Sequence, residues 1–131
     1  MRMPCLSILL ITVGLGVPLS ALGQARDPAS RQTLVDMAYV LGEAHALRQV
    51  CEGGSDQYWR TRMVRLVDTE QPDEALTQRL KDAFNTGFVA RQAGFPTCSP
   101  AARTAMTKVM ARGKVLARRL ARTVPTDPAQ P

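Results

Sequence analysis

Cysteine and histidine are the residue types that can take part in the most kinds of chemistry, and this chain has few of either. Among 131 residues there are three cysteines, Cys5, Cys51 and Cys98, and one histidine, His45. Redox-active cysteine pairs usually lie close together, as in Cys-X-X-Cys, whereas Cys51 and Cys98 are 47 positions apart. One histidine without a second ligand at a zinc-like spacing argues against a metal site. We therefore expect a structural Cys51–Cys98 disulfide, with no metal and no cofactor; a redox pair is the alternative.

A second group of residues, near the two cysteines in the expected fold, could line a shallow ligand or partner site. It consists of His45, Arg48, Glu52, Tyr58, Trp59, Arg91 and Phe95. Aromatic rings beside charges occur in small-molecule sites and equally in the packing around a disulfide. His45 has no nucleophile partner that would make it a catalytic base. We favour the packing interpretation, and we name no catalytic residue.

Positive charge is concentrated near the C-terminus. Residues 101–122 contain seven bases and no acid, whereas residues 26–100 contain nine bases and ten acids. At 100° per residue the bases fall opposite the apolar side chains, so a helix here would present a basic stripe to solvent. The basic stripe consists of Arg103, Lys108, Arg112, Lys114, Arg118, Arg119 and Arg122. Such a stripe could bind an anionic partner, and an ordinary solvated face is the alternative.

The N-terminus has the layout of an export signal. Arg2 precedes an uncharged stretch whose apolar middle, residues 6–17, is about as long as the ~7–15 residues of a signal core and too short to span a bilayer. Small residues at both ends of Gly23-Gln24-Ala25 predict cleavage before Arg26, with an uncleaved anchor as the alternative. We expect export, most simply to the periplasm, where Cys51 and Cys98 can be oxidised.

Four helices are expected in the mature chain, because no stretch alternates apolar and polar residues as a half-buried strand does. Capping residues, prolines and glycines place them between residues 27 and 53, 55 and 71, 72 and 94, and 99 and 124. Ser55 and Asp56 are expected to cap the second helix, and Pro72 to lie in the first turn of the third. Gly113 on the inner arc of the last helix predicts a close helix contact.

The expected fold is therefore all-α, a small up-down four-helix bundle spanning residues 26–124, with a signal peptide at 1–25 and a disordered tail at 125–131. In such a bundle the first helix ends and the last begins at the same pole. Cys51 and Cys98 fall at this pole, which supports both the topology and the disulfide. Closing a loop of about 48 residues should stabilise the fold by roughly 4 kcal/mol in the chain-entropy description.

Two segments resemble a known group of proteins: GEAHALRQVCEGGSDQYWRTRM, from Gly42 to Met63, and FNTGFVARQAGFPTCSPAAR, from Phe84 to Arg103. They are similar to small exported bacterial proteins classed as a domain of unknown function. The similarity spans most of residues 32–110, and the stretch around GFPTC is fairly specific. The resemblance implies export and cysteine pairing, and it brings no catalytic residues with it.

These features favour a non-catalytic exported envelope protein that binds an anionic surface, or another envelope protein, through its basic C-terminal helix. Nucleic acid is not expected as a partner outside the cytoplasm, and no transmembrane helix is expected in the mature chain. One alternative is a periplasmic stress chaperone that opens adaptable faces containing Met37, Met63, Met106 and Met110. The other is a small enzyme with a site at the cysteine pole. The sequence does not indicate the oligomeric state.

We predict that the exported protein begins at Arg26. The intact mass of the protein recovered from the periplasmic fraction should equal that of residues 26–131, less the hydrogens lost in forming one disulfide. A mass that includes Cys5 would contradict cleavage and support a retained anchor.

Overall fold

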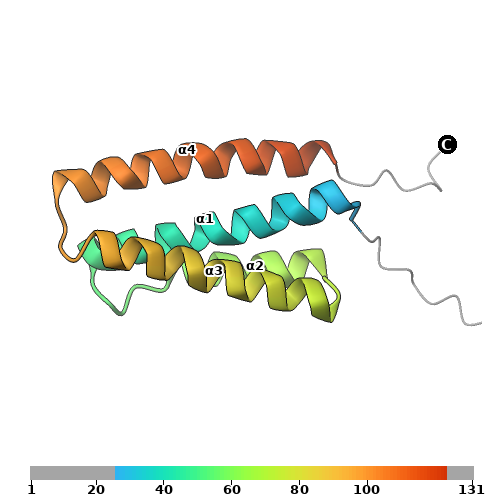
Figure 1. Ribbon diagram of the computed structural model, residues 1–131, viewed down its shortest axis with the longest axis horizontal. Helices are drawn as coiled ribbons and strands as arrows, with labels where there is room; N and C mark the ends of the chain where they lie inside the picture. The colour runs from blue at the N-terminus through green and yellow to red at the C-terminus, as the bar shows by residue number, and fades with distance from the viewer. Residues whose placement is uncertain (1–25, 124–131) are drawn as a thin grey trace, which may run out of the picture.

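The computed structural model describes residues 26–123, which form four α-helices. These are α1 (Pro28–Glu52), α2 (Tyr58–Glu70), α3 (Glu74–Gly94) and α4 (Pro100–Arg122). Figure 1 shows that consecutive helices run in opposite directions, so the predicted all-α, up-down arrangement is confirmed. Within residues 26–123, no helix is both long enough and apolar enough to cross a bilayer. The expected signal peptide (1–25) and tail (125–131) lie outside the described residues.

Side-chain caps begin the first and last helices as predicted. The Asp27 carboxylate accepts hydrogen bonds from the backbone N–H groups of Ala29 and Ser30, both at 3.0 Å. The Ser99 hydroxyl accepts from the backbone N–H of Ala102 at 3.1 Å. Each helix then continues with a proline in its first turn, where the missing N–H leaves no intrahelical bond unmade.

The starts of α2 and α3 were predicted slightly too early. Asp56 lies one residue before the N-cap of α2, which is Gln57 and makes no side-chain cap. The Asp56 carboxylate pairs with Arg48 at 2.9 Å and, as a cap would, accepts from the first backbone N–H of α2, that of Tyr58, at 3.1 Å. Pro72 precedes the N-cap of α3, which is Asp73. The Asp73 carboxylate accepts from the backbone N–H of Leu76 at 2.8 Å, and this side-chain cap satisfies one of the first N–H groups of α3, which have no intrahelical partner.

Helix α1 is the centre of the bundle. It packs against each of the other three helices, and Figure 1 shows it between α4 on one side and α2 and α3 on the other. One apolar cluster joins α1 to α2 and α3 around Leu34, Leu80 and Phe84, while a second joins α1 to α4 around Leu47 and Val109. Because both sides of α1 are covered, every residue from 40 to 47 is buried.

Two glycines allow α1 and α3 to approach until their backbones touch. A Cβ atom at Gly42 would lie 1.9 Å from the carbonyl oxygen of Phe84, and one at Gly87 would lie 2.2 Å from the carbonyl oxygen of Tyr39. The predicted close contact at Gly113 is also present but is looser, since a Cβ there would meet the Val40 side chain at 3.3 Å. The tightest helix contact is therefore α1 with α3, which are not consecutive in the chain.

Helix α4 is fixed to the rest of the bundle at both ends. At one pole the predicted Cys51–Cys98 disulfide joins the end of α1 to the residues before α4, with Cα atoms 4.8 Å apart. At the other pole the Arg26 guanidinium contacts Glu70 at 2.7 Å and donates to the carbonyl oxygens of Leu120 and Thr123 at 3.3 and 3.2 Å. A cation there also complements the negative end of the α4 dipole.

Substitution of Gly42 or Gly87 by alanine should lower the free energy of unfolding by about 3 kcal/mol or more, because the added methyl group would overlap a backbone carbonyl that cannot rotate away. Gly94→Ala is the matched control: Gly94 also lies in α3, and a Cβ there meets no atom within 4 Å. The stability of the Gly94→Ala variant should be unchanged or slightly raised. Urea denaturation measures all three variants, and equal effects at Gly42 and Gly94 would contradict the backbone contact.

Candidate functional site

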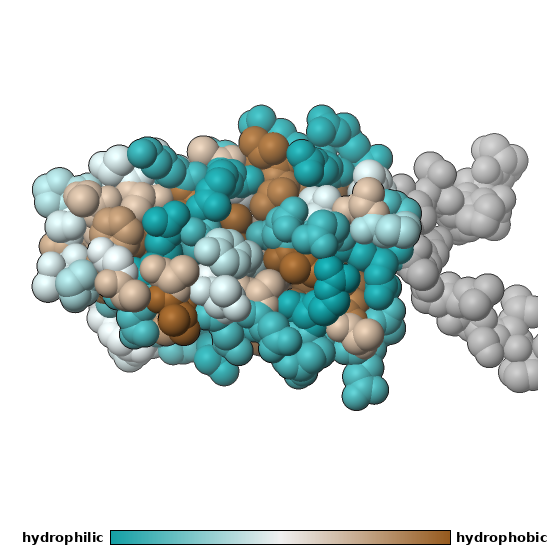
Figure 2. All heavy atoms as spheres, viewed as in Figure 1, coloured by the Kyte–Doolittle hydropathy of each residue, from teal (hydrophilic) through white to brown (hydrophobic). Residues whose placement is uncertain are grey.

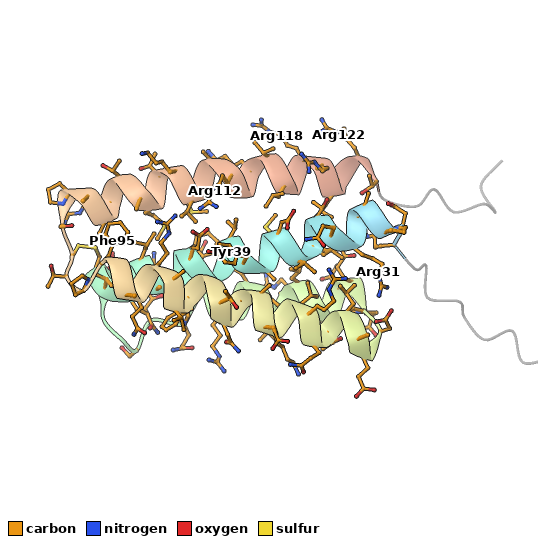
Figure 3. All side chains as sticks on the ribbon, in the orientation of Figure 1. Arg31, Tyr39, Phe95, Arg112, Arg118 and Arg122 are labelled. Atoms are coloured by element: carbon orange, nitrogen blue, oxygen red, sulfur yellow. A yellow bond between two sulfur atoms is a disulfide. The ribbon has the colours of Figure 1, made fainter. Side chains whose placement is uncertain are left out.

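Helix α4 has the two-sided character that the sequence predicted. Its buried residues Ala102, Ala105, Val109, Gly113 and Leu120 face the bundle, and all seven residues of the basic stripe are exposed. Figure 3 shows the side chains of Arg118 and Arg122 pointing away from α1, on the outer side of α4. Within residues 26–123, six of the seven bases form no ion pair with a carboxylate.

Arg112 differs from the other six and is not a simple outward base. Its guanidinium is 2.5 Å from Oε2 of Glu43 on α1, while Nε of Arg91 on α3 donates to Oε1 of the same carboxylate at 2.8 Å. The Glu43 side chain is only 3% exposed, whereas those of Arg91 and Arg112 are 31% and 48% exposed. We call this arrangement the charge bridge; it links three helices through one buried carboxylate.

The charge bridge explains how the Glu43 carboxylate can be buried in the centre of the bundle. A buried ion is costly unless it is paired and its lone pairs are satisfied, and two charge-assisted hydrogen bonds achieve this for Glu43. Sequence reasoning did not single out Glu43. The signal that could have found it is a lone acid in residues 40–47, which are otherwise apolar apart from His45, because such a charge requires a partner from another element.

Two hollows lie beside the charge bridge along α4. The first, of about 470 Å³, is between α1 and α4 and is lined by Tyr39, Arg112, Val115 and Leu116 among others. The second, of about 360 Å³, is between α3 and α4 and includes Arg91, Phe95 and Lys108. Each hollow therefore contains one arginine of the charge bridge. A third, of about 340 Å³, lies between α2 and α3, away from α4.

The structure separates the residues expected at the cysteine pole. Arg48, Tyr58 and Trp59 gather where α1 meets α2: the two aromatic rings are edge to face at 4.9 Å, and the Arg48 guanidinium lies 4.8 Å from the Tyr58 ring centroid. Arg91 and Phe95 lie together in the hollow between α3 and α4.

Two further residues of that group lie apart from these pairs: Glu52 is exposed at the end of α1, and His45 is buried. Among the described residues no three His, Cys, Asp or Glu side chains are grouped so that they could hold a metal ion.

His45 lies inside the bundle against two aromatic rings of α3. Its ring centroid is 5.7 Å from that of Phe84 and 5.4 Å from that of Phe88, and the residue is 4% exposed. Nδ1 of His45 is buried without a hydrogen-bond partner among the described residues. Desolvation, reinforced by the positive charge of Arg60 and opposed by Asp56, lowers the pKa of His45 below its ordinary value of 6.5. The imidazole is therefore neutral at pH 7.

Residues 30–123 match a protein-family model described as "Protein of unknown function (DUF2385)". No curated protein and no solved structure matches the chain.

The burial of His45 predicts loss of stability in mildly acidic solution. Below about pH 6.5 the unfolded chain binds a proton at this histidine while the folded protein, whose His45 pKa is lower, does not, so the free energy of unfolding should fall by at most about 1.4 kcal/mol per pH unit. His45→Leu should abolish this dependence between pH 7 and pH 5, as measured by urea denaturation at each pH.

The carboxylates of Asp27 and Asp73 do not interfere with this test, because hydrogen bonds lower their pKa values from 3.8, mainly those with Ser30 and Arg31 respectively. Their stabilising contributions are present at pH 5 and are lost only as the pH falls below about 4. An equal pH dependence in wild type and His45→Leu would show that His45 is not the group responsible.

Proposed function

The chain belongs to the DUF2385 family, which is described as proteins of unknown function, and we propose that it is an exported envelope protein that binds an anionic lipid surface through α4. The observation that supports this proposal is the set of six exposed bases on α4 that pair with no carboxylate within residues 26–123. A surface that only needed solubility would mix charges of both signs, whereas residues 101–122 contain no acid.

The attachment of α4 supports the same function. The disulfide and Arg26 hold the helix at its two ends, so its outer bases are displayed on a rigid rod rather than on a loop. The cysteine residues are exposed, and an exposed disulfide persists in oxidising compartments such as the periplasm, where reducing thiols are scarce. In that compartment, anionic phospholipid head groups are available partners for a basic helix.

The two alternative functions have less support from the described residues. Of the methionines expected to open onto clients, Met63 is buried, and Met37, Met106 and Met110 are partly buried against the core, as ordinary core fillers are. His45, the candidate acid or base of an enzyme, is packed against phenylalanines. Binding through α4 therefore remains the function that the geometry supports best.

The proposal predicts that Lys114→Gln, Arg118→Gln and Arg122→Gln together weaken binding to phosphatidylglycerol vesicles by about two orders of magnitude at low salt. Each base near an anionic surface contributes about 1 kcal/mol, and about 1.4 kcal/mol corresponds to a tenfold change. Arg112 is left unchanged because it holds Glu43. The melting temperature should hardly change, because all three side chains are exposed. Co-sedimentation at low and high salt measures the binding.

The matched control replaces Arg60, Arg62 and Arg65 on α2 by glutamine. This variant removes the same net charge from another exposed helix face, so its vesicle binding should decrease far less. Equal losses in the two variants would mean that overall charge, and not α4, attracts the protein. Unchanged vesicle binding in the α4 variant would show that the basic stripe is an ordinary solvated face.

A further inference from the structure

The two hollows beside α4 follow one another along the same flank of this helix, and we call them together the α4 furrow. Figure 3 shows Arg112 on α4 and Tyr39 on α1 across from each other, with Phe95 nearer the end of the bundle where α3 ends. Phe95 lines the hollow between α3 and α4, and Tyr39 lines the hollow between α1 and α4. The charge bridge lies between them, since Arg91 belongs to one hollow, Arg112 to the other, and both bind Glu43.

The middle of the α4 furrow is suited to a phosphate group. Arg91 and Arg112 are held by Glu43 from below, yet about a third and about half of their side chains remain exposed. A guanidinium has five N–H donors, so each arginine retains donors for a further acceptor. Lys108 lines the same hollow as Arg91 and forms no ion pair with a described carboxylate. Three cations against the buried Glu43 and the exposed Asp36, which lines the same hollow as Arg112, still leave the α4 furrow with net positive charge.

One end of the α4 furrow is apolar. Tyr39, Val40, Val115 and Leu116 line the hollow of about 470 Å³ together with Ala111, Arg112 and the exposed Asp36, and Val115 is 52% exposed although it is aliphatic. On the face shown in Figure 2, apolar side chains reach the surface among the hydrophilic ones of α4 and α1. Both hollows fall within the volume of about 300–1,000 Å³ that is usual for small-molecule sites.

We propose that the α4 furrow binds one anionic lipid molecule, with its phosphate at Arg91, Lys108 and Arg112 and an acyl chain along Tyr39, Val115 and Leu116. This inference deepens the proposed function and rests on it for the source of the lipid, the anionic surface that α4 approaches. A second copy of the chain packed through the same face is a poor occupant, because it would bring its own basic α4 to this one. An acidic amphipathic helix would need an apolar stripe along its whole length, whereas the furrow is charged in its middle.

The probe is lysophosphatidylglycerol below its micelle-forming concentration, titrated into the purified protein by calorimetry. We expect saturable binding of one molecule. Lysophosphatidylcholine, whose head group has no net charge, should bind about tenfold more weakly, and inorganic phosphate, which lacks the chain, should be weaker still. This comparison separates recognition of a whole lipid from recognition of a free anion.

Two substitutions test the two halves of the furrow. Val115→Asn places a polar group on the apolar end, and Lys108→Gln removes a cation from the phosphate end; each should weaken binding about tenfold. The controls are Val89→Asn on α3 and Arg65→Gln on α2. Val89 and Arg65 are an exposed valine and an exposed base outside the basic stripe, and neither lines the two hollows of the furrow. The two control substitutions should change the affinity for lysophosphatidylglycerol by less than about twofold.

The outcomes distinguish this inference from the proposed function. If vesicles bind but monomeric lysophosphatidylglycerol does not, the furrow proposal is overturned while surface binding stands. If the lysolipid binds and substitution of Lys114, Arg118 and Arg122 leaves vesicle binding unchanged, the furrow proposal stands and surface binding through the stripe fails. Equal effects of Val115→Asn and Val89→Asn on lysolipid binding would also overturn the furrow proposal. Tight binding of an acidic amphipathic peptide in place of the lysolipid would overturn it as well.

Discussion

The backbone contact between α1 and α3 is the constraint on which the rest of this structure depends. Gly42 and Gly87 remove the side chains that would separate the two helices, so Glu43, next to Gly42, lies close to α3. Arg91 is one helical turn beyond Gly87 and reaches the Glu43 carboxylate at 2.8 Å. The same approach places His45 against Phe84 and Phe88. A single pair of glycines thereby determines the surroundings of the two buried titratable groups of α1, Glu43 and His45.

Local features of the sequence were sufficient for the four helices, the shared pole of Cys51 and Cys98, and the outward direction of most bases on α4. Each depends on residues a few positions apart, or on connectivity alone. The central position of α1 could not be predicted in this way, because a helix that packs against three neighbours has no single narrow apolar face to orient it. Periodicity identifies a face, but it does not identify the helix that the face will contact.

The charge bridge was missed for a related reason. Arg91 and Arg112 are 48 and 69 positions from Glu43, so no spacing rule connects them. Arg112 also stands at the edge of the basic arc, where a small rotation of the helix decides between solvent and a buried carboxylate. The small errors at the starts of α2 and α3 have a local cause. Asp56 and Asp73 are both good N-cap residues, and Asp56 accepts from the backbone N–H of Tyr58 one residue before the N-cap, where it also pairs with Arg48.

The way α4 is held explains how a rigid bundle could accept a ligand. Helix α1 contacts α2, α3 and α4, and α4 packs chiefly on α1. The side of α4 that faces α3 is joined to it through the Arg112–Glu43–Arg91 bridge rather than through a continuous apolar interface. Partly exposed arginines can shift toward a phosphate without opening the α1–α3 contact, because the cost of moving them is a hydrogen bond and not a cavity in the core. The tight contact between α1 and α3 and the looser packing between α3 and α4 therefore lie on opposite sides of Glu43, and the positive charge lies on the looser side.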